Sequence, residues 1–270
     1  MLAAADTARP FLKWAGGKRQ LLGELLRHAP RATARYHEPF LGGGALFFAL
    51  KPARAVLSDV NLRLIRTYRG VKDDVERVIG LLESYPHDAD FYYELREVDI
   101  DRRSDAEVAA WFIYLNKTGF NGLYRVNRDN RFNVPFGRYA RPTICNKATL
   151  RACSRALERA EILHLDFEQA VKKARRGDFV YFDPPYVPLS ATSSFTSYTS
   201  NGFDAGAQTR LRDIAKKLKR SGVRVLLSNS SAPFVRNLYK SGFVLHEVSA
   251  LRPVNSKATK RGAVTELLIR

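Results

Sequence analysis

The sequence predicts an α/β fold built on a doubly wound, mostly parallel sheet, with an inserted, mainly helical domain. Short apolar strands alternate with helical periodicities near both ends of the chain, whereas the middle of the chain has no convincing strand. Hydrophobic residues make up 45% of the 270 residues and aromatic residues 11%, which is enough for a large buried core. We therefore expect a discontinuous core domain, residues 1–61 and 149–270, and an inserted domain, residues 62–148.

Short, mainly apolar runs predict the strands. They span residues 36–40, 53–57, 162–165, 179–182, 223–227, 244–248 and 264–269. The first run leads into Gly42-Gly43-Gly44 and then Ala45–Leu50, which is the pattern of a strand, a glycine turn and a helix start. The second run ends in Ser58-Asp59. Because helices separate most of these strands, we expect them to pair largely in parallel.

Apolar residues at helical spacing predict the helices. Residues 18–28, for example, carry four leucines on one stripe. Further helices are expected at 45–50, from 60 onward, and at 72–84, 90–98, 104–115, 168–175, 207–220 and 232–241. The segment 116–147 is irregular and rich in Asn, Arg, Gly and Pro, and a long loop inside a compact domain is usually functional or disordered.

The chain carries a net charge of +18, and the surplus is unevenly spread. Residues 67–110 hold six basic and twelve acidic side chains, whereas 117–159 hold ten and two, and 205–261 hold thirteen and two. Clustered positive charge suits a polyanion, because each neutralised phosphate releases counterions. A solvated basic surface explains the charge equally well, so composition alone does not decide.

The sharpest motif is Asp183-Pro184-Pro185-Tyr186, directly after the strand 179–182. Ligands of open parallel sheets bind at the carboxyl ends of the strands. An Asp oxygen and a backbone carbonyl held by rigid prolines can both accept hydrogen bonds from one exocyclic amine, and Tyr186 offers a face on which an extruded base can stack. A strand end closed by a proline turn is the alternative.

A second group of residues suits a nucleotide-like cofactor. Glu38 and Phe40 precede the glycines 42–44, where small residues allow close approach and the next helix offers free amides. Asp59 lies about twenty residues on, where an acidic side chain binds ribose hydroxyls. The glycines do not form GxGxxG, and Asp183-Pro184-Pro185-Tyr186 has no role in hydride transfer. A methyl donor with a sulfonium centre is therefore favoured over a dehydrogenase cofactor.

Two further segments combine aromatic and polar groups. Near the amino terminus, Phe11 to Lys18 joins an aromatic residue, a glycine turn and two lysines. The loop from Asn116 to Tyr139 mixes arginines and asparagines with Phe120, Leu123 and Phe132. Arginine for guanine, apolar groups for the thymine methyl and an aromatic for stacking are the parts of a base-reading loop.

The sequence lacks the residue patterns that a zinc site or a cysteine nucleophile would require. The five histidines show no zinc-binding pattern, and neither Cys145 nor Cys153 belongs to a cysteine pair. Neither cysteine follows a proline, as the nucleophile of carbon-5 pyrimidine methylation normally does. We expect no metal. With no long apolar stretch and no signal-peptide core, we expect a soluble, cytoplasmic protein.

In the order of its motifs the sequence resembles the Dam family of DNA adenine-N6 methyltransferases, the α-class enzymes that methylate the adenine of GATC. The resemblance extends from Phe11 to about Ile269. It is carried by residues 11–18, Glu38-Pro39-Phe40, Asp59, Asn121-Gly122-Leu123, 132–139, Asp183-Pro184-Pro185-Tyr186 and 188–192. Tyr124 is less typical of that family. The resemblance implies a Rossmann-like methyltransferase sheet, with 62–148 as the target-recognition domain.

It also implies roles for single residues. The catalytic motif would hold the flipped adenine through Asp183, Pro184, Pro185 and Tyr186. The S-adenosyl-L-methionine site would comprise Trp14, Ala15, Gly16, Lys18, Glu38, Phe40, Gly42, Gly44, Asp59, Asp166, Phe167 and Asp183. The DNA contacts would be Lys13, Arg96, Phe120, Asn121, Leu123, Arg125, Asn127, Asn133, Pro135 and Arg138.

The sequence thus predicts a site-specific, S-adenosylmethionine-dependent enzyme that methylates N6 of adenine in double-stranded DNA by base flipping, and that is a monomer in solution. A cytosine-N4 methyltransferase, which uses the same amine chemistry, and a catalytically silent DNA-binding protein remain the alternatives. A solitary enzyme, a restriction-modification partner and a phage protein are equally compatible with the sequence.

Overall fold

The computed structural model describes residues 7–18, 20–187, 203–251 and 263–270. The run 188–192 and the end of the basic segment, 252–261, lie outside the described residues. The chain forms two compact units. Unit 1 comprises Met1–Gly17, Gly42–Lys51 and Ser58–His164, and unit 2 comprises Lys18–Leu41, Pro52–Leu57 and Leu165–Arg270. Among the described residues no helix is long and apolar enough to cross a membrane.

The strands form one sheet in the order β3-β2-β1-β4-β5-β7-β6. Their bounds are β1 Tyr36–Glu38, β2 Ala55–Asp59, β3 Ala160–His164, β4 Phe179–Phe182, β5 Arg224–Ser230, β6 Leu245–Leu251 and β7 Ala263–Ile269. The pairs β1–β2, β1–β4 and β4–β5 are parallel. All four residues of β4 are buried, which explains its uninterrupted apolar sequence. The expected α/β class and the mostly parallel sheet are confirmed.

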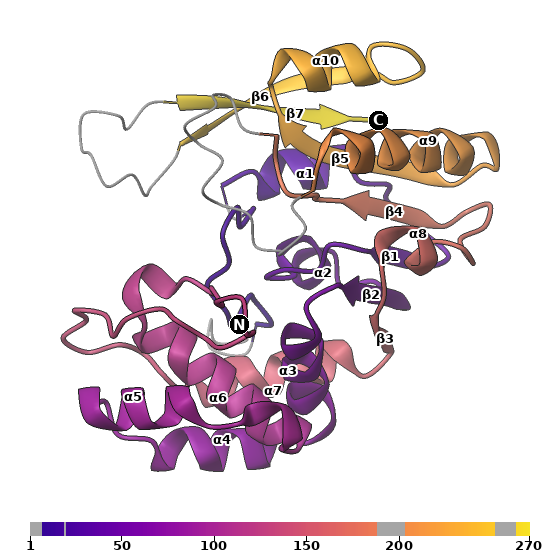
Figure 1. The fold of residues 1–270 in the computed structure, drawn as a ribbon. Helices are drawn as coiled ribbons and strands as arrows, with labels where there is room; N and C mark the ends of the chain where they lie inside the picture. Colours follow the sequence, from indigo (N-terminus) through magenta and orange to yellow (C-terminus); the bar gives the residue numbers. More distant parts are fainter. Residues whose placement is uncertain (1–6, 19, 188–202, 252–262) are drawn as a thin grey trace. The chain divides into compact units, whose positions relative to one another are not determined.

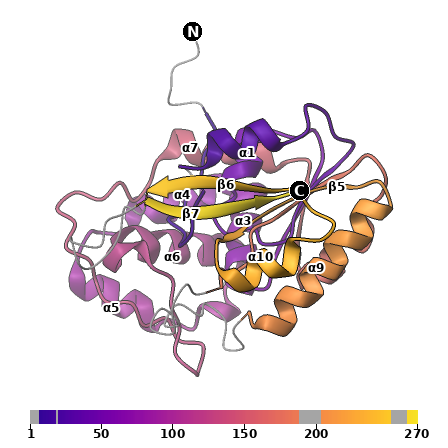
Figure 2. The same cartoon turned by 90° about the horizontal axis from the view of Figure 1, so that it is seen from above.

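The last strand is the exception to parallel pairing. β7 runs antiparallel to both β5 and β6 and lies between them. Figure 2 shows β6 and β7 side by side with their arrows in opposite directions. As a result, the amino-terminal half of β7 lies beside the carboxyl end of β5, where Glu266 is opposite Ser230.

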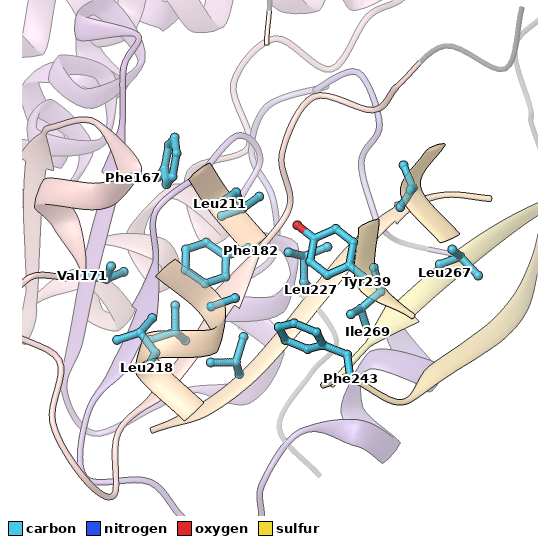
Figure 3. Packing of buried hydrophobic residues seen from close by; sticks show 14 of the residues in the cluster. Phe167, Val171, Phe182, Leu211, Leu218, Leu227, Tyr239, Phe243, Leu267 and Ile269 are labelled. Atoms are coloured by element: carbon cyan, nitrogen blue, oxygen red, sulfur yellow. The ribbon is translucent and has the colours of Figure 1, made fainter. Parts of the chain in front are cut away.

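Unit 2 buries its core between the sheet and its helices. These are α1 Leu22–His28, α8 Phe167–Ala170, α9 Ala205–Arg220 and α10 Pro233–Tyr239. Leu211 and Leu218 of α9 and Tyr239 of α10 pack with Phe182 and Leu227 of the sheet (Figure 3). The apolar stripe of α9 is therefore the face that anchors the helix beside β4 and β5.

Unit 1 is mainly helical. Its helices are α2 Ala45–Leu50, α3 Leu62–Asp73, α4 Val75–Ser84, α5 Ala89–Glu97, α6 Asp105–Thr118 and α7 Lys147–Leu157, with short 3-10 turns η2 Ile100–Arg102 and η3 Phe120–Gly122. α6 is buried on almost every side, and α3, α4 and α5 pack around it (Figure 1). A capping box formed by Ser104 and Glu107 begins α6.

Most predicted elements are present with shifted ends, and one was missed. α1 begins at Leu22 rather than at residue 18, and α8 ends at Ala170, well before residue 175. α7 was not predicted, although Asn146 caps its first turn and its buried residues recur at helical spacing. The loop 116–147 is irregular as expected, apart from η3 and the isolated bridges Gly119↔Phe136 and Val126↔Phe132.

Candidate functional site

Asp183 lies at the carboxyl end of β4 in unit 2, and two donors hold the same oxygen of its carboxylate. Lys18 Nζ lies 2.8 Å from Asp183 Oδ1, and the Ser228 hydroxyl donates to that oxygen, also over 2.8 Å. The Tyr181 hydroxyl lies 2.8 Å from Ser228 Oγ. Ser228 and Tyr181 are buried. The carboxylate is therefore fixed through Oδ1, and Oδ2 can accept a hydrogen bond from an amine.

Tyr186 is held at its hydroxyl and at its ring face. The hydroxyl donates to Glu266 Oε2 over 2.6 Å, and Lys18 Nζ lies 4.7 Å from the ring centroid. Burial raises the pKa of Tyr186 well above its usual value, and the nearby carboxylates of Asp183 and Glu266 raise it further. The phenol is thus neutral at physiological pH and acts as a hydrogen-bond donor.

The proline segment is held from the opposite face of the sheet. Gln208 Nε2 donates to the Pro185 carbonyl over 3.2 Å, and Asn229 Nδ2 donates to Gln208 Oε1 over 3.0 Å. Gln208 and Asn229 are fully buried. Because side chains alternate along a strand, Ser228 contacts the motif from one face of β5, and its neighbour Asn229 supports the motif through Gln208 from the other face.

Glu38 ends β1, the parallel neighbour of β4. It is buried and accepts a hydrogen bond from the Tyr36 hydroxyl over 2.9 Å. Burial, followed by the Glu38 charge, raises the pKa of Tyr36 well above its usual value, so this donor also stays protonated. Two carboxylates, Glu38 and Asp183, are thus placed by the carboxyl ends of adjacent strands.

An aromatic cluster also belongs to unit 2. Phe40 stacks on Phe167 with ring centroids 5.4 Å apart, and Phe203 meets both rings edge-on. The guanidinium of Arg210 lies 5.0 Å from the Phe167 ring centroid, and its Nη2 lies 3.4 Å from Asp166 Oδ2. Asp166 also caps α8 by accepting from the Glu168 amide. Phe40, Asp166 and Phe167 are therefore brought together.

In unit 1, Asp59 and the glycine turn are joined directly. The Gly42 amide donates to Asp59 Oδ2 over 3.1 Å, and the Asn61 amide donates to Oδ1 over 3.0 Å. Burial raises the pKa of Asp59, whereas these amides oppose that rise. Gly42 has φ +47°, and a Cβ there would lie 2.6 Å from the Trp14 ring. Gly44, with φ +63°, precedes α2.

Trp14 belongs to a stack of rings in unit 1. Its ring centroid lies 6.0 Å from the ring centroid of Tyr124 and 6.3 Å from that of Phe112, at interplanar angles of 24° and 22°. Tyr124 and Phe112 are 4.7 Å apart and nearly parallel. Tyr124 is buried, so the residue that is less typical of the Dam family serves packing here. After Trp14, Ala15 and Gly16 form a turn closed by the Gly17 amide on the Trp14 carbonyl.

Asn116 fixes Lys13 to the loop 116–139. Its Oδ1 accepts from the Lys13 amide over 2.8 Å, and its Nδ2 donates to the carbonyls of Lys13 and Gly122 over 2.9 and 2.8 Å. Asn116 is buried. Asn121 has φ +54°, so the backbone turns sharply beside Lys13. Sequence reasoning did not assign Asn116 to the site, although a buried asparagine at the end of an apolar helix is a readable signal.

The loop exposes several of the side chains predicted to contact DNA. Phe120 is 49% exposed, an unusual state for a phenylalanine. The exposed Arg125 is oriented by Asn133, whose side-chain oxygen and carbonyl accept from the guanidinium over 2.7 and 3.0 Å. The Asn127 side chain organises a turn by accepting from the amides of Asp129 and Arg131.

The remaining predicted DNA contacts lie on several elements of unit 1. The Pro135 carbonyl accepts from the Phe120 amide, Leu123 is half-buried and Arg138 is exposed. Arg96 lies on α5, where it pairs with Glu97 and covers the Tyr93 ring. The predicted residues thus fall into two sets. Unit 2 holds Lys18, Glu38, Phe40, Asp166, Phe167, Asp183, Pro184, Pro185 and Tyr186, and unit 1 holds the others.

Sequence reasoning missed the residues that support Asp183-Pro184-Pro185-Tyr186. They are Ser228, Asn229, Gln208 and Glu266. Two of them leave a signal. Gln208 interrupts the apolar stripe of α9, and Glu266 is a charge within a mainly apolar strand. Polar residues in such positions are normally hydrogen-bonded to something, but the sequence does not say to what.

The cysteines are unsuited to nucleophilic chemistry. Burial raises the pKa of Cys153 to about 12, and its Sγ lies 3.1 Å from the Arg9 carbonyl. Burial also raises the pKa of the half-buried Cys145. Within the part of the chain that the structure describes, no three His, Cys, Asp or Glu side chains gather where they could hold a metal ion.

Comparison with known proteins extends over nearly the whole chain. The sequence model of a family described as D12 class N6 adenine-specific DNA methyltransferase matches residues 14–254. The type II methyltransferase M1.LlaDCHI of Lactococcus lactis subsp. cremoris is 48% identical over 269 residues, covering 97% of this chain and 94% of that protein. The type II methyltransferase M.MjaIII of Methanocaldococcus jannaschii is 41% identical over 284 residues, covering 97% and 98%. The DNA adenine methylase of Escherichia coli is 37% identical over 264 residues, covering 96% and 94%.

Proposed function

The chain belongs to the D12 class of N6 adenine-specific DNA methyltransferases, and from this premise we propose that it methylates adenine within GATC in double-stranded DNA, as a monomer, with S-adenosylmethionine as the methyl donor. The names of the relatives, which include DNA adenine methylases, support adenine as the methylated base, and the sequence resemblance supports GATC as the site. Residues 62–148 are proposed as the target-recognition domain, and 1–61 with 149–270 as the catalytic domain.

The residues present fit this cofactor. The glycine turn leaves no room for a Cβ at Gly42, and each oxygen of Asp59 keeps a lone pair for a ribose hydroxyl beyond the amide that it accepts. Phe40 and Phe167 offer flat apolar faces for an adenine ring.

When bound, S-adenosylmethionine supplies an electrophilic methyl group on sulfonium. The protein's own task is to present the adenine amine. Asp183 Oδ2 and the Pro184 carbonyl accept the two N6 hydrogens, which directs the nitrogen lone pair outward. The base stacks on Tyr186 after leaving the duplex. The observation that carries this proposal is the fixed Asp183 carboxylate, held through Oδ1 by Lys18 and Ser228.

On the DNA side, the exposed side chains of the loop 116–139 are proposed to read the target. The exposed Phe120 ring would fill the space of the extruded base. Arg125, already oriented by Asn133, would contact a guanine edge. Lys13, Arg96, Asn127 and Arg138 are proposed to contact the backbone or neighbouring bases.

Methyl transfer from labelled S-adenosylmethionine to a duplex with one GATC site tests the proposal, followed by nucleoside mass spectrometry. We expect N6-methyladenine in the GATC duplex, little in a duplex with the site scrambled, and none with Asp183→Ala. N4-methylcytosine as the product would show that the enzyme methylates cytosine instead of adenine. Cofactor binding without transfer to any base would reduce the protein to a DNA-binding module.

A further inference from the structure

Glu266 touches the motif that is proposed to hold the target base, although it lies 80 residues further along the chain. Its Oε2 accepts a hydrogen bond from the Tyr186 hydroxyl over 2.6 Å. Both side chains are half-buried. A short bond between a neutral phenol and a carboxylate is charge-assisted, and such bonds are about twice as strong as neutral ones.

The antiparallel insertion of β7 explains how this glutamate reaches the motif. Glu266 lies opposite Ser230 of β5 and opposite Val248 of β6. Ser230 is the last residue of β5, and β5 pairs in parallel with β4, which Asp183 follows. A parallel β7 would have placed its carboxyl end at this edge. The direction of this one strand therefore delivers Glu266 to Tyr186.

The Tyr186 ring is constrained at two points. Glu266 holds the hydroxyl, and the Lys18 ammonium lies 4.7 Å from the ring centroid. Lys18 is itself paired with Asp183 over 2.8 Å. One continuous chain of contacts thus joins Asp183, Lys18, Tyr186 and Glu266. The plane of the ring is fixed relative to the carboxylate that is proposed to bind the amine.

We propose that Glu266 is a positioning residue of the reaction: it orients Tyr186 so that the extruded adenine stacks with its amine directed at Asp183. The assignment rests on the proposed function of Tyr186 and Asp183. Glu266 acts through the phenol, since its carboxylate contacts the hydroxyl. Its removal should therefore lower kcat and leave the KM for S-adenosylmethionine unchanged.

A double-mutant cycle between Glu266 and Tyr186 tests the assignment. Glu266→Ala should lower kcat about tenfold, the loss expected when one oriented hydrogen bond disappears. Glu266→Gln keeps an oxygen that can accept from the phenol, so it should retain most of the activity. In a Tyr186→Phe background, Glu266→Ala should cause no further loss, because the hydroxyl through which it acts is already absent.

Glu247→Ala is the matched control. Glu247 lies on the neighbouring strand β6 and pairs with Arg236 over 2.6 Å. Its removal deletes a glutamate of the same sheet, and kcat should stay at the wild-type value. Calorimetric binding of S-adenosylmethionine and the thermal midpoint confirm that each variant is folded. If Glu266→Ala fails either check, Glu266→Leu, which also removes the acceptor oxygen, takes its place in the cycle.

Base position is read separately with 2-aminopurine at the target adenine. Its fluorescence is quenched by stacking, so Glu266→Ala should brighten the complex relative to wild type, and Glu266→Gln should not. Equal kcat in Glu266→Ala and wild type overturns the assignment. The assignment is also overturned if Glu266→Ala lowers kcat as much in the Tyr186→Phe background as it does in the wild type. Wild-type enzyme that methylates no adenine overturns the proposed function itself, which separates the two failures.

Discussion

At the scale of single residues, the central feature is a carboxylate whose two oxygens have different surroundings. Asp183 Oδ1 is bound by Lys18 and by Ser228, which is itself in contact with the Tyr181 hydroxyl. Fixing one oxygen restricts the carboxylate to one orientation before substrate arrives. Preorganisation of this kind places the cost of ordering in the folding of the protein rather than in the reaction.

Ser228→Ala should therefore lower kcat. A hydrogen bond to a charged group contributes about 1.5–3 kcal/mol, which corresponds to a loss of about 10- to 100-fold if it acts fully in the transition state. Steady-state kinetics with a GATC duplex provides the measurement. Ser230→Ala is the control on the same face of β5, because the buried Ser230 hydroxyl has no hydrogen-bond partner among the described residues. Similar losses in both variants would contradict a specific role for Ser228.

Cys153 gives a prediction about pH. Burial raises its pKa to about 12, so the folded protein keeps the thiol neutral where an unfolded thiol has begun to ionise. The unfolded chain therefore releases this proton first as pH rises. The contribution of Cys153 to stability is complete below a pH of about 8.5 and is lost as pH rises toward 12.

Alkylation in a Cys145→Ser background tests the premise of this prediction, which is that the folded protein keeps the Cys153 thiol buried and neutral. Iodoacetamide should leave Cys153 unmodified at pH 8 in the native protein and modify it after denaturation. In the wild type, the half-buried Cys145 should react first. Rapid labelling of native Cys153 at pH 8 would show that its thiol is neither buried nor held neutral.

At the scale of elements, strand and helix positions could largely be read from the sequence, whereas strand direction could not. The run 264–269 was predicted as a strand, but periodicity says nothing about whether it enters the sheet parallel or antiparallel. That direction decides which end of the sheet receives Glu266. The candidate motif was therefore visible in sequence, and its supports on β5, β7 and α9 were not.

The glycine turn before α2 is the element whose sequence requirement is clearest. Gly42 combines φ +47° with a missing Cβ that would lie 2.6 Å from the Trp14 ring. We expect Gly42→Ala to weaken S-adenosylmethionine binding at least tenfold, because both the backbone and Trp14 must shift; left-handed backbone alone costs about 1 kcal/mol for a residue with a side chain.

Isothermal titration with the cofactor checks this, with Gly80→Ala as the control. Gly80 lies within α4, and a Cβ there meets nothing within 4 Å. That substitution should raise stability by about 0.4–1 kcal/mol and leave cofactor binding unchanged. Unchanged binding by a folded Gly42→Ala protein would remove the turn from the cofactor site.

At the scale of the whole molecule, the charge of +18 divides into neutralised and available parts. Within unit 1, Arg151 pairs with Glu76 and Lys147 with Glu83, so part of the acidic stretch 67–110 is balanced by the basic stretch 117–159. The exposed arginines 125, 128, 131, 138 and 141 remain, with Asp129 the one carboxylate between them. The positive charge available to DNA in this unit is therefore concentrated in the loop proposed to read it.

Two arginines of this loop should separate sequence choice from affinity. Arg125→Ala should reduce the discrimination between GATC and a site with one altered base pair by about 1–3 kcal/mol, because the proposed bidentate contact to guanine would be lost. The exposed Arg128 lacks an orienting partner comparable to Asn133 among the described contacts. Arg128→Ala should weaken binding to every duplex alike and reduce the slope of log K against log salt by about 1. Fluorescence anisotropy between 50 and 200 mM salt measures both quantities. If Arg125→Ala weakens all duplexes equally, Arg125 contributes charge alone, and the loop's sequence choice must come from its apolar side chains.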